Sequence, residues 1–238
     1  MELETIVFDF DGTLAHLNID FGEMKRQVLL LFPEFGLDST LAQGTYVLEG
    51  IEAAMQALKA QGKGERAAEF SRRAEEILLS VEAEAAKESF LLDGIPQTLR
   101  DLKARGLYLG IITRNSTLAV RSILTRDSLT HDLLLSRDDV GRGRVKPNPE
   151  HLREALQMLR GTPSTCLMVG DHPLDIQVAK RAGAHSAAVL TGRHRARDFE
   201  EAGADLILES VKELPSLFDR SSLRTKAWYW TLSPRSWS

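Results

Sequence analysis

Short apolar runs recur along the chain, and most carry apolar side chains at both odd and even positions. Strands that are covered on both faces show this pattern, because neither side of the strand meets water. We therefore expect buried strands of a parallel sheet at residues 5–10, 107–113, 165–171, 186–190 and 204–208.

Helical stretches with recognisable ends lie between the later runs. Gly106 stands where the C-terminal cap of a helix belongs, and so does Gly183. Asn148 followed by Pro149 is typical of a helix start. Strand and helix thus alternate from about residue 94 to 218, which predicts an α/β fold with a doubly wound, parallel-sheet (Rossmann-like) core.

The stretch from about residue 18 to 88 interrupts this alternation. Its apolar residues recur every three or four positions, which is the spacing of an amphipathic helix. We expect at least three helices in a row, with residues 32–39 as a loop between the first two. Inserted after the first strand, they would sit above the strand ends, where α/β folds bind ligands. The recurring positions are Phe21, Met24, Val28, Phe32, Leu48, Ile51, Met55, Leu58, Ala67, Phe70, Ala74, Ile77, Val81 and Ala85.

These patterns predict two domains and a tail. Residues 1–16 and 89–219 would form the α/β catalytic core, and residues 17–88 an inserted, all-helical cap domain. Residues 220–238 would form a C-terminal tail that contains all three tryptophans. We expect this tail to dock on its own domain or on a symmetry mate, or to be disordered; the alternative is a site for a specific partner.

Composition narrows the function classes without choosing among them. The 238 residues carry a formal charge of −4, so no basic footprint indicates nucleic acid. A single cysteine, Cys166, excludes an internal disulfide and fits a reducing compartment. We find no signal peptide and no run of about 18 apolar residues, so we expect a cytoplasmic protein that does not span a membrane.

Polar residues follow three of the apolar runs at the point where each run ends. Asp9 follows the first, Thr113 the second and Asp171 the third. Because the carboxyl ends of parallel strands meet at one edge of a sheet, these side chains should lie together at the ligand edge. Asp175 falls in the first turn of the next helix, and Lys146 lies in a loop just before another.

Asp9 and Asp11 are two residues apart, so an extended chain would aim both carboxylates to one side. Two like charges held that close repel, and burying either one without a partner is costly. Taken alone, each candidate has an ordinary explanation, such as a turn at Asp11-Gly12 or a solvated charge at Lys146. The joint pattern, in this order and always at strand ends or adjacent loops, indicates a functional site.

Four segments carry a family resemblance. "DFDGTL" (9–14), "IITRN" (111–115), "VKPNP" (145–149) and "GDHPLDIQVAKRAGA" (170–184) resemble the four motifs of the haloacid dehalogenase superfamily, in its phosphatase branch. The helical insert after the first strand resembles the cap of the phosphoglycolate phosphatase-like subgroup. The resemblance covers roughly residues 4 to 210.

The resemblance implies a role for each candidate residue. Asp9 would be the nucleophile, Asp11 the general acid/base, Thr113 a phosphate ligand and Lys146 the neutraliser of charge. Mg²⁺ would be bound by Asp9, by the backbone carbonyl of Asp11 and by Asp171, with Asp175 supporting that site. The phosphate site would comprise Gly12, Thr113, Arg114, Asn115 and Lys146, with a surface position as the alternative for Arg114.

The chemistry of phosphoryl transfer agrees with these assignments. It needs a nucleophile, in-line geometry and positive charge around the equatorial oxygens. A carboxylate acts as nucleophile by forming an aspartyl phosphate, which splits one difficult step into two. A divalent cation and Lys146 would make the acidic pair tolerable. The dehalogenase branch lacks an acid at the position of Asp11, so this residue favours phosphate esters.

Some residues depart from the family pattern. The first motif continues into Ala15-His16-Leu17, where the subgroup often has Asp-Ser. This segment joins the core to the cap, so the departure bears on substrate choice and cap motion. His172 more plausibly caps the helix at Pro173 than binds metal. Four cap residues offer substrate contacts but are more often solvated on amphipathic helices: Lys25, Arg26, Arg72 and Arg73.

The leading hypothesis is a Mg²⁺-dependent phosphatase acting on a small phosphorylated metabolite, with phosphoglycolate as the first guess. We expect a monomer or a homodimer with no nucleic-acid or membrane partner. A phosphomutase or phosphotransferase of the same fold is one alternative, and a non-catalytic binding protein is another. A receiver domain does not fit, because its acceptor Asp lies on a later strand and it has no helical insert.

Overall fold

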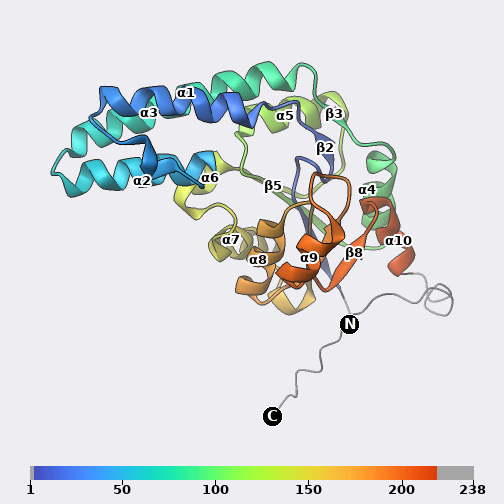
Figure 1. The fold of residues 1–238 in the computed structure, drawn as a ribbon. Helices are drawn as coiled ribbons and strands as arrows, with labels where there is room; N and C mark the ends of the chain where they lie inside the picture. Colours follow the sequence, from blue (N-terminus) through green and yellow to red (C-terminus); the bar gives the residue numbers. More distant parts are fainter. Residues whose placement is uncertain (1–2, 219–238) are drawn as a thin grey trace, which may run out of the picture.

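The computed structural model describes residues 3–218, and the tail predicted at residues 220–238 lies outside this range. Within the described residues, one parallel sheet has the strand order β5-β4-β1-β6-β7-β8 (Figure 1). Its strands are β1 (Thr5–Phe8), β4 (Tyr108–Ile112), β5 (Leu133–Leu135), β6 (Cys166–Gly170), β7 (His185–Val189) and β8 (Leu206–Leu208). The doubly wound α/β prediction is confirmed, because the order reverses between β1 and β6.

Helices cover both faces of the sheet. Helices α7 and α8 pack on one face and are followed by α9, while α4 and α10 lie on the other (Figure 1). Right-handed crossovers require this division, since the chain winds outward from β1 in one direction and then in the other. The helices are α4 (Ile95–Ala104), α5 (Thr117–Arg126), α6 (Arg137–Val140), α7 (Pro149–Leu159), α8 (Pro173–Ala182), α9 (Ala196–Ala202) and α10 (Leu214–Leu217).

All five predicted strands form; four are shorter than their apolar runs, and β7 has the predicted length but begins one residue earlier, at His185. Strand β5 was not predicted; it contains only three leucines and lies at one edge of the sheet. Such a short run cannot be distinguished from a loop by its periodicity alone. The predicted helix ends are correct: Asn148 caps α7 by accepting from the Glu150 N–H at 3.1 Å, and Gly183 ends α8 in the left-handed conformation.

Three helices between β1 and α4 form a separate bundle, which projects to one side of the sheet (Figure 1). They are α1 (Phe21–Glu34), α2 (Val47–Ala60) and α3 (Gly64–Ala86), with a 3₁₀ turn at Ser39–Ala42. The predicted loop begins too early, because α1 continues through Pro33 to Glu34. Phe32 and Phe35 both pack edge-on against Phe70 of α3, at 5.5 and 5.2 Å between ring centroids, and their burial keeps this turn helical.

The buried face of α3 differs from the predicted stripe at its C-terminal end. Leu78 and Glu82 are buried, whereas the predicted Ile77 and Val81 are only partly buried. A buried glutamate is rare unless it has a partner, and Glu82 faces the guanidinium of Arg137. A charge pairing with another segment therefore decides which residue of this turn faces inward.

The two chain crossings between sheet and bundle lie side by side. Strand β2 (Ala15–His16) pairs antiparallel with β3 (Phe90–Leu91), and the Leu92 N–H donates to the Leu14 carbonyl at 2.9 Å. The ends of the inserted stretch are thus tied together next to the first strand. Among residues 3–218, none of the helices combines the length and the apolar character needed to cross a bilayer.

Candidate active site

The carboxyl ends of three neighbouring strands deliver three polar side chains to one place. β1 lies between β4 and β6, with Phe8 opposite Ile111 on one side and Val169 on the other. Asp9, Thr113 and Asp171 each follow one of these strands. The expectation that these side chains share one edge of the sheet follows directly from this register.

Lys146 lies between two of the carboxylates. Its ammonium donates to Asp9 Oδ1 and also, at 2.6 Å, to Asp175 Oδ1. All three side chains are buried, with Lys146 only 2% exposed. Burial acts against the charged form of Lys146, but the charges of Asp175 and Asp9 outweigh it and raise the pKa of this lysine.

Asp171 completes a group of three carboxylates that we call the acid cluster: Asp9, Asp171 and Asp175. One oxygen from each lies within 4.8 Å of the others. The Thr13 hydroxyl lies 3.3 Å from Asp171 Oδ1 and 3.5 Å from Asp9 Oδ2. Asp175 is fixed from the other side, because its Oδ2 accepts from the His172 N–H at 3.1 Å.

Glycines allow the backbone to approach these carboxylates closely. A Cβ added to Gly12 or Gly192 would overlap the Asp171 carboxylate, and one added to Gly170 would overlap Asp175. Gly12 also has φ = +81°, which disfavours any other residue there. Its N–H donates to the Ala15 carbonyl at 2.7 Å, so in this arrangement Gly12 contributes close approach rather than a free donor.

The acid cluster holds more negative than positive charge. Burial, together with the charges of Asp9 and Asp175, raises the pKa of Asp171 to about 9. Burial likewise raises the pKa of Asp175 to about 6, with Lys146 opposing it. Three carboxylates with oxygen atoms this close and one ammonium between them suit an oxygen-binding divalent cation, which supplies the missing positive charge.

Asp11 stands apart from the acid cluster. Its Oδ1 accepts from the Leu17 N–H at 2.8 Å, and its carboxylate is not among the three that converge. Burial raises its pKa to about 7, and the charge of Asp9 adds to this, while the hydrogen bond from Leu17 acts against it. At neutral pH a carboxyl with this pKa both gives and takes a proton readily.

Thr113 and Asn115 are buried in the segment that follows β4. The Thr113 hydroxyl accepts from the Asn115 N–H at 3.2 Å, so its own O–H remains available to donate. The Asn115 carbonyl accepts from the Arg137 N–H at 3.2 Å, which ties this loop to the segment after β5.

Arg114 reaches the helical bundle rather than the acid cluster. Its guanidinium makes two hydrogen bonds to the carboxylate of Glu49 on α2, at 2.8 and 2.9 Å. A third goes to the carbonyl of Lys146 at 2.6 Å, and the Tyr46 ring lies 5.5 Å from its Cζ. Arg114 thus connects the loop after β4 to α2.

His172 begins α8 as expected, since its Nδ1 accepts from the Leu174 N–H at 3.1 Å. Its Nε2 lies 3.2 Å from the Tyr46 hydroxyl, which brings the residue before α2 to the rim of the site. The His194 ring packs against His172 at 4.4 Å between centroids. Burial, and then His194, lowers the pKa of His172 to about 4, so this imidazole is neutral at neutral pH.

Sequence analysis missed three residues that shape the site. Thr13 bridges two carboxylates, as described above, and Thr191 donates to the Gly12 carbonyl at 2.6 Å. His151 is fully buried and holds the Lys146 loop, accepting from the Lys146 N–H at 3.3 Å while its Nε2 lies 3.1 Å from the Leu135 carbonyl. The signal for Thr191 was present, because it follows an apolar run just as Thr113 does.

A second group of buried and partly buried charges lies where the bundle meets the α/β core. This interface cluster comprises Glu75, Glu82, Arg137 and Arg142. Arg137 contacts Glu82 at 2.7 Å and Glu75 at 2.8 Å, and Arg142 contacts Glu75. Glu82 also accepts from the Ser116 N–H at 3.1 Å. At hydrogen-bond distance two carboxylates meet two guanidinium groups, so these charges balance; Glu52, which is 31% exposed, approaches Arg142 only to 3.7 Å.

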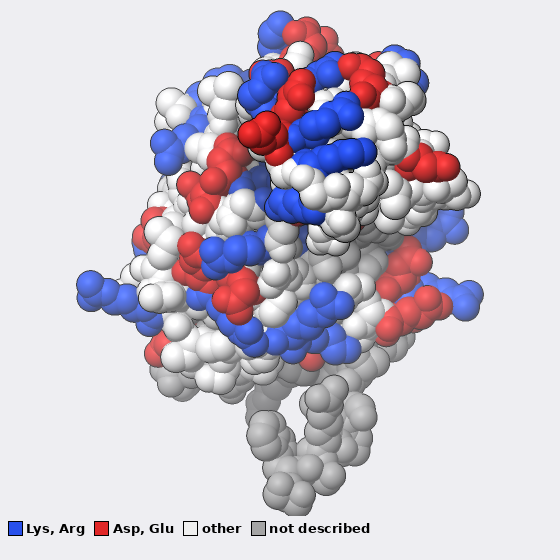
Figure 2. Space-filling model, turned by 90° about the vertical axis from the view of Figure 1, so that its left-hand side faces the viewer, with Lys and Arg blue, Asp and Glu red and all other residues white. Residues whose placement is uncertain are grey.

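The four basic residues considered for substrate contact are already engaged within the bundle. Arg26 pairs with Glu23, Arg72 with Glu76, and Arg73 with Glu34. Lys25 donates to the Thr45 carbonyl. Figure 2 shows the end-on view of the bundle, where basic and acidic side chains lie next to one another.

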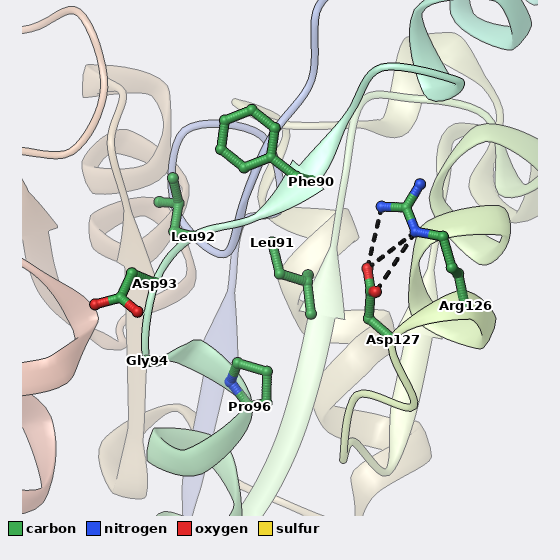
Figure 3. A pocket seen from close by; sticks show the side chains of 8 residues that line it. All are labelled: Phe90, Leu91, Leu92, Asp93, Gly94, Pro96, Arg126 and Asp127. Atoms are coloured by element: carbon green, nitrogen blue, oxygen red, sulfur yellow. Dashed lines mark hydrogen bonds and ion pairs between the residues drawn. The ribbon is translucent and has the colours of Figure 1, made fainter.

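Two cavities lie outside the acid cluster. One, of about 400 Å³, lies where β3 leads into α4 (Figure 3). Its lining is Phe90, Leu91, Leu92, Asp93, Gly94, Pro96, Arg126 and Asp127. Arg126 is held there by Asp127 and by the Ser89 carbonyl. The other, of about 600 Å³, opens between α2 and residues 142–149.

The sequence is similar to those of known proteins along most of its length. The model of a hydrolase family, the haloacid dehalogenase-like hydrolases, matches residues 3–183. The N-acetylmuramic acid 6-phosphate phosphatase of Pseudomonas putida is 30% identical over 222 residues, which cover 92% of this chain and 97% of that protein. The phosphoglycolate phosphatase of Nitrosospira multiformis is 27% identical over 226 residues, covering 93% and 98%.

The fold has solved counterparts. The crystal structure of a predicted phosphatase from Clostridium acetobutylicum superposes with a TM-score of 0.64. It shares 21% sequence identity and covers 91% of this chain and 98% of its own. At this level of identity the likeness shows the fold alone.

Proposed function

This chain belongs to the haloacid dehalogenase-like hydrolases, and from that premise we propose that it is a Mg²⁺-dependent phosphatase that hydrolyses a small phosphate monoester. One observation carries the proposal: Asp9, Asp171, Asp175 and Lys146 converge, while Asp11 is held apart beside them. This arrangement separates a charged group that attacks from a carboxyl that transfers protons.

Asp9 is the nucleophile in this proposal. Its carboxylate attacks the phosphorus atom, the bond to the ester oxygen breaks, and an aspartyl phosphate forms. Asp11 gives its proton to the departing alcohol oxygen and then takes one from the water that hydrolyses the aspartyl phosphate. Its pKa of about 7 suits both halves of this cycle.

The acid cluster would hold the metal ion. Asp9, Asp171 and the backbone carbonyl of Asp11 would be ligands, with Asp175 supporting the site. Lys146 already donates to Oδ1 of Asp9 and of Asp175, and the His172 N–H donates to Oδ2 of Asp175, which leaves Asp9 Oδ2 and the Asp171 carboxylate for a cation. When bound, Mg²⁺ supplies positive charge to phosphoryl oxygens.

Other residues meet the transferred phosphoryl group. Lys146 keeps Asp9 in place and neutralises charge, and the free O–H of Thr113 donates to a phosphoryl oxygen. Asn115 and Gly12 complete this wall of the site. Arg114 reaches the phosphate only when Glu49 releases it.

We assign residues 17–88 to a cap and residues 1–16 and 89–219 to the catalytic core. Tyr46 and Glu49 of the bundle contact His172 and Arg114 at the rim, which supports a cap that covers the site. A covered site excludes water during the attack by Asp9. The paired crossings at β2 and β3 are the place where such a cap would move.

The substrate we propose is a small phosphate ester of a hydroxy acid. Both curated relatives described above have names that specify a phosphate ester of an acid. Phosphoglycolate is the simplest ester of this class, and N-acetylmuramic acid 6-phosphate is a larger one.

The test is phosphate release from a panel of phosphate esters, with Mg²⁺ or with a chelator, for the wild type and Asp9→Asn. We expect release that requires the metal and is abolished in Asp9→Asn. Full activity of Asp9→Asn against an aryl phosphate would refute the nucleophile assignment. Transfer of the phosphoryl group to a sugar phosphate instead of water would identify a mutase, and binding without turnover would identify a non-catalytic protein.

A further inference from the structure

A second arginine lies at the edge of the site, in the loop between β7 and α9. Arg193 directly follows two residues that are fixed against the acid cluster. Thr191 donates to the Gly12 carbonyl at 2.6 Å, and Gly192 packs so closely on Asp171 that a Cβ would overlap it. The backbone before Arg193 is therefore held in place at the site.

The residue after Arg193 is held as well, because the His194 ring packs against His172. The Arg193 side chain itself is exposed. Its backbone lies next to the segment that carries Asp11, because the Thr191 hydroxyl donates to the carbonyl of Gly12, the residue that follows Asp11. Arg193 thus has a backbone that is fixed next to the segment of the general acid, and an exposed head group.

The cations near the site differ in what they already bind. Lys146 is shared by two carboxylates, and Arg114 has its guanidinium occupied by Glu49 and a carbonyl. By contrast, Arg193 makes no hydrogen bond or ion pair with any residue in 3–218. An arginine with five unused donors beside a reaction centre is available to a ligand.

The position of Asp11 tells which part of the substrate Arg193 would meet. A general acid protonates the leaving oxygen, so Asp11 marks the leaving-group side of the site. Building on the proposed function, we propose that Arg193 binds a carboxylate carried by the leaving group, and so selects phosphate esters of hydroxy acids. The planar guanidinium fork matches a carboxylate with two parallel hydrogen bonds.

The experiment uses two pairs of esters, each an acid with a neutral analogue: in the first a carboxylate replaces a hydroxymethyl group, and in the second the acid carries an added lactyl ether group. The pairs are 2-phosphoglycolate with 2-hydroxyethyl phosphate, and N-acetylmuramic acid 6-phosphate with N-acetylglucosamine 6-phosphate. We measure kcat and KM for the wild type and Arg193→Gln. We expect the wild type to prefer the acid of at least one pair, and the variant to raise KM for that acid by about 10- to 100-fold. The neutral partner should change by less than about threefold.

Two further variants sharpen the result. Arg195→Gln removes an arginine two positions along, whose charge acts on Asp198 instead, and should leave both KM values unchanged. Arg193→Lys should restore only part of the preference, because an ammonium lacks the planar fork.

Several outcomes would overturn the inference. Equal loss on the acid and the neutral ester in Arg193→Gln would mean that Arg193 acts through Asp11, and would overturn the inference. An unchanged preference would overturn it too. If the wild type hydrolyses esters without preferring either acid, the inference fails while the proposed function stands. If no ester releases phosphate, the proposed function fails and takes the inference with it.

Discussion

The acid cluster and the interface cluster are both buried groups of charge, but they differ in balance. Asp9, Asp171 and Asp175 have one lysine among them, and burial, followed by the charges of Asp9 and Asp175, raises the pKa of Asp171. Glu75 and Glu82 face two arginines at hydrogen-bond distance. An excess of negative charge that the fold maintains indicates a binding site for a cation, whereas a balanced cluster indicates a structural role.

Asp9→Asn tests the unbalanced cluster and should have the largest effect. We expect phosphate release to fall by at least about a thousandfold, because the nucleophile is lost. The free energy of unfolding in a chelator should stay the same or rise by about 1 kcal/mol, since a negative charge crowded against other carboxyl groups disappears. Chemical denaturation measures the second quantity, and a loss above about 2 kcal/mol would contradict the charge imbalance.

Glu82→Gln tests the balanced cluster and should lower stability while leaving activity nearly unchanged. It leaves the buried Arg137 without its closest ionic partner, so we expect a loss of about 3 kcal/mol in the free energy of unfolding. The folded variant should keep kcat within about threefold of the wild type. Glu76→Gln, which changes an exposed pair on the same helix, is the matched control and should cost under about 0.5 kcal/mol. Equal effects of the two substitutions would remove the distinction between the clusters.

His151 offers a pH test, because it supports the Lys146 loop while remaining neutral. Burial, and then Lys146, lowers its pKa to about 3, from 6.5 in the unfolded chain. The contribution of the neutral imidazole to the free energy of unfolding is complete above pH 6.5. It is lost as the pH falls toward 3, because over this range only the unfolded chain takes up the proton. This amounts to about 2 kcal/mol between pH 6.5 and 5.

We therefore expect His151→Asn to flatten the dependence of unfolding free energy on pH over this range. The acid cluster titrates in both proteins, so the difference between wild type and variant isolates the imidazole. His16→Asn removes an exposed histidine and should leave the slope unchanged. An identical slope in His151→Asn would show that this histidine does not remain neutral in the folded protein.

The Arg114–Glu49 pair belongs to neither cluster. Its removal should have the smallest effect on the free energy of unfolding. It is partly exposed, with side-chain exposures of 19% and 39%, so solvent weakens it. A double-mutant cycle with Arg114→Gln and Glu49→Gln should give a coupling of about 0.5–1 kcal/mol that falls with salt. A coupling above about 2 kcal/mol would place this pair with the interface cluster.

The strands and the site edge were predictable because they depend on local patterns. An apolar run that ends in an acid specifies both a buried strand and a residue at its carboxyl end, as at Asp9 and Asp171. The interface cluster was not predictable, since Glu82 and Arg137 are 55 positions apart and each looks like a surface charge. The short strand β5 was also missed, because three residues carry no period.

The sequence by itself determined which residues lie at the ligand edge, and in what order they arrive. Periodicity and helix caps are properties of neighbouring residues, and they place Asp9, Thr113, Asp171 and Asp175 without knowledge of the packing. Only the tertiary structure decided which cations are occupied: Arg114 is held by Glu49, whereas Arg193 is free within the described residues. Pairing between distant charges depends on how elements pack, and no local pattern encodes those distances.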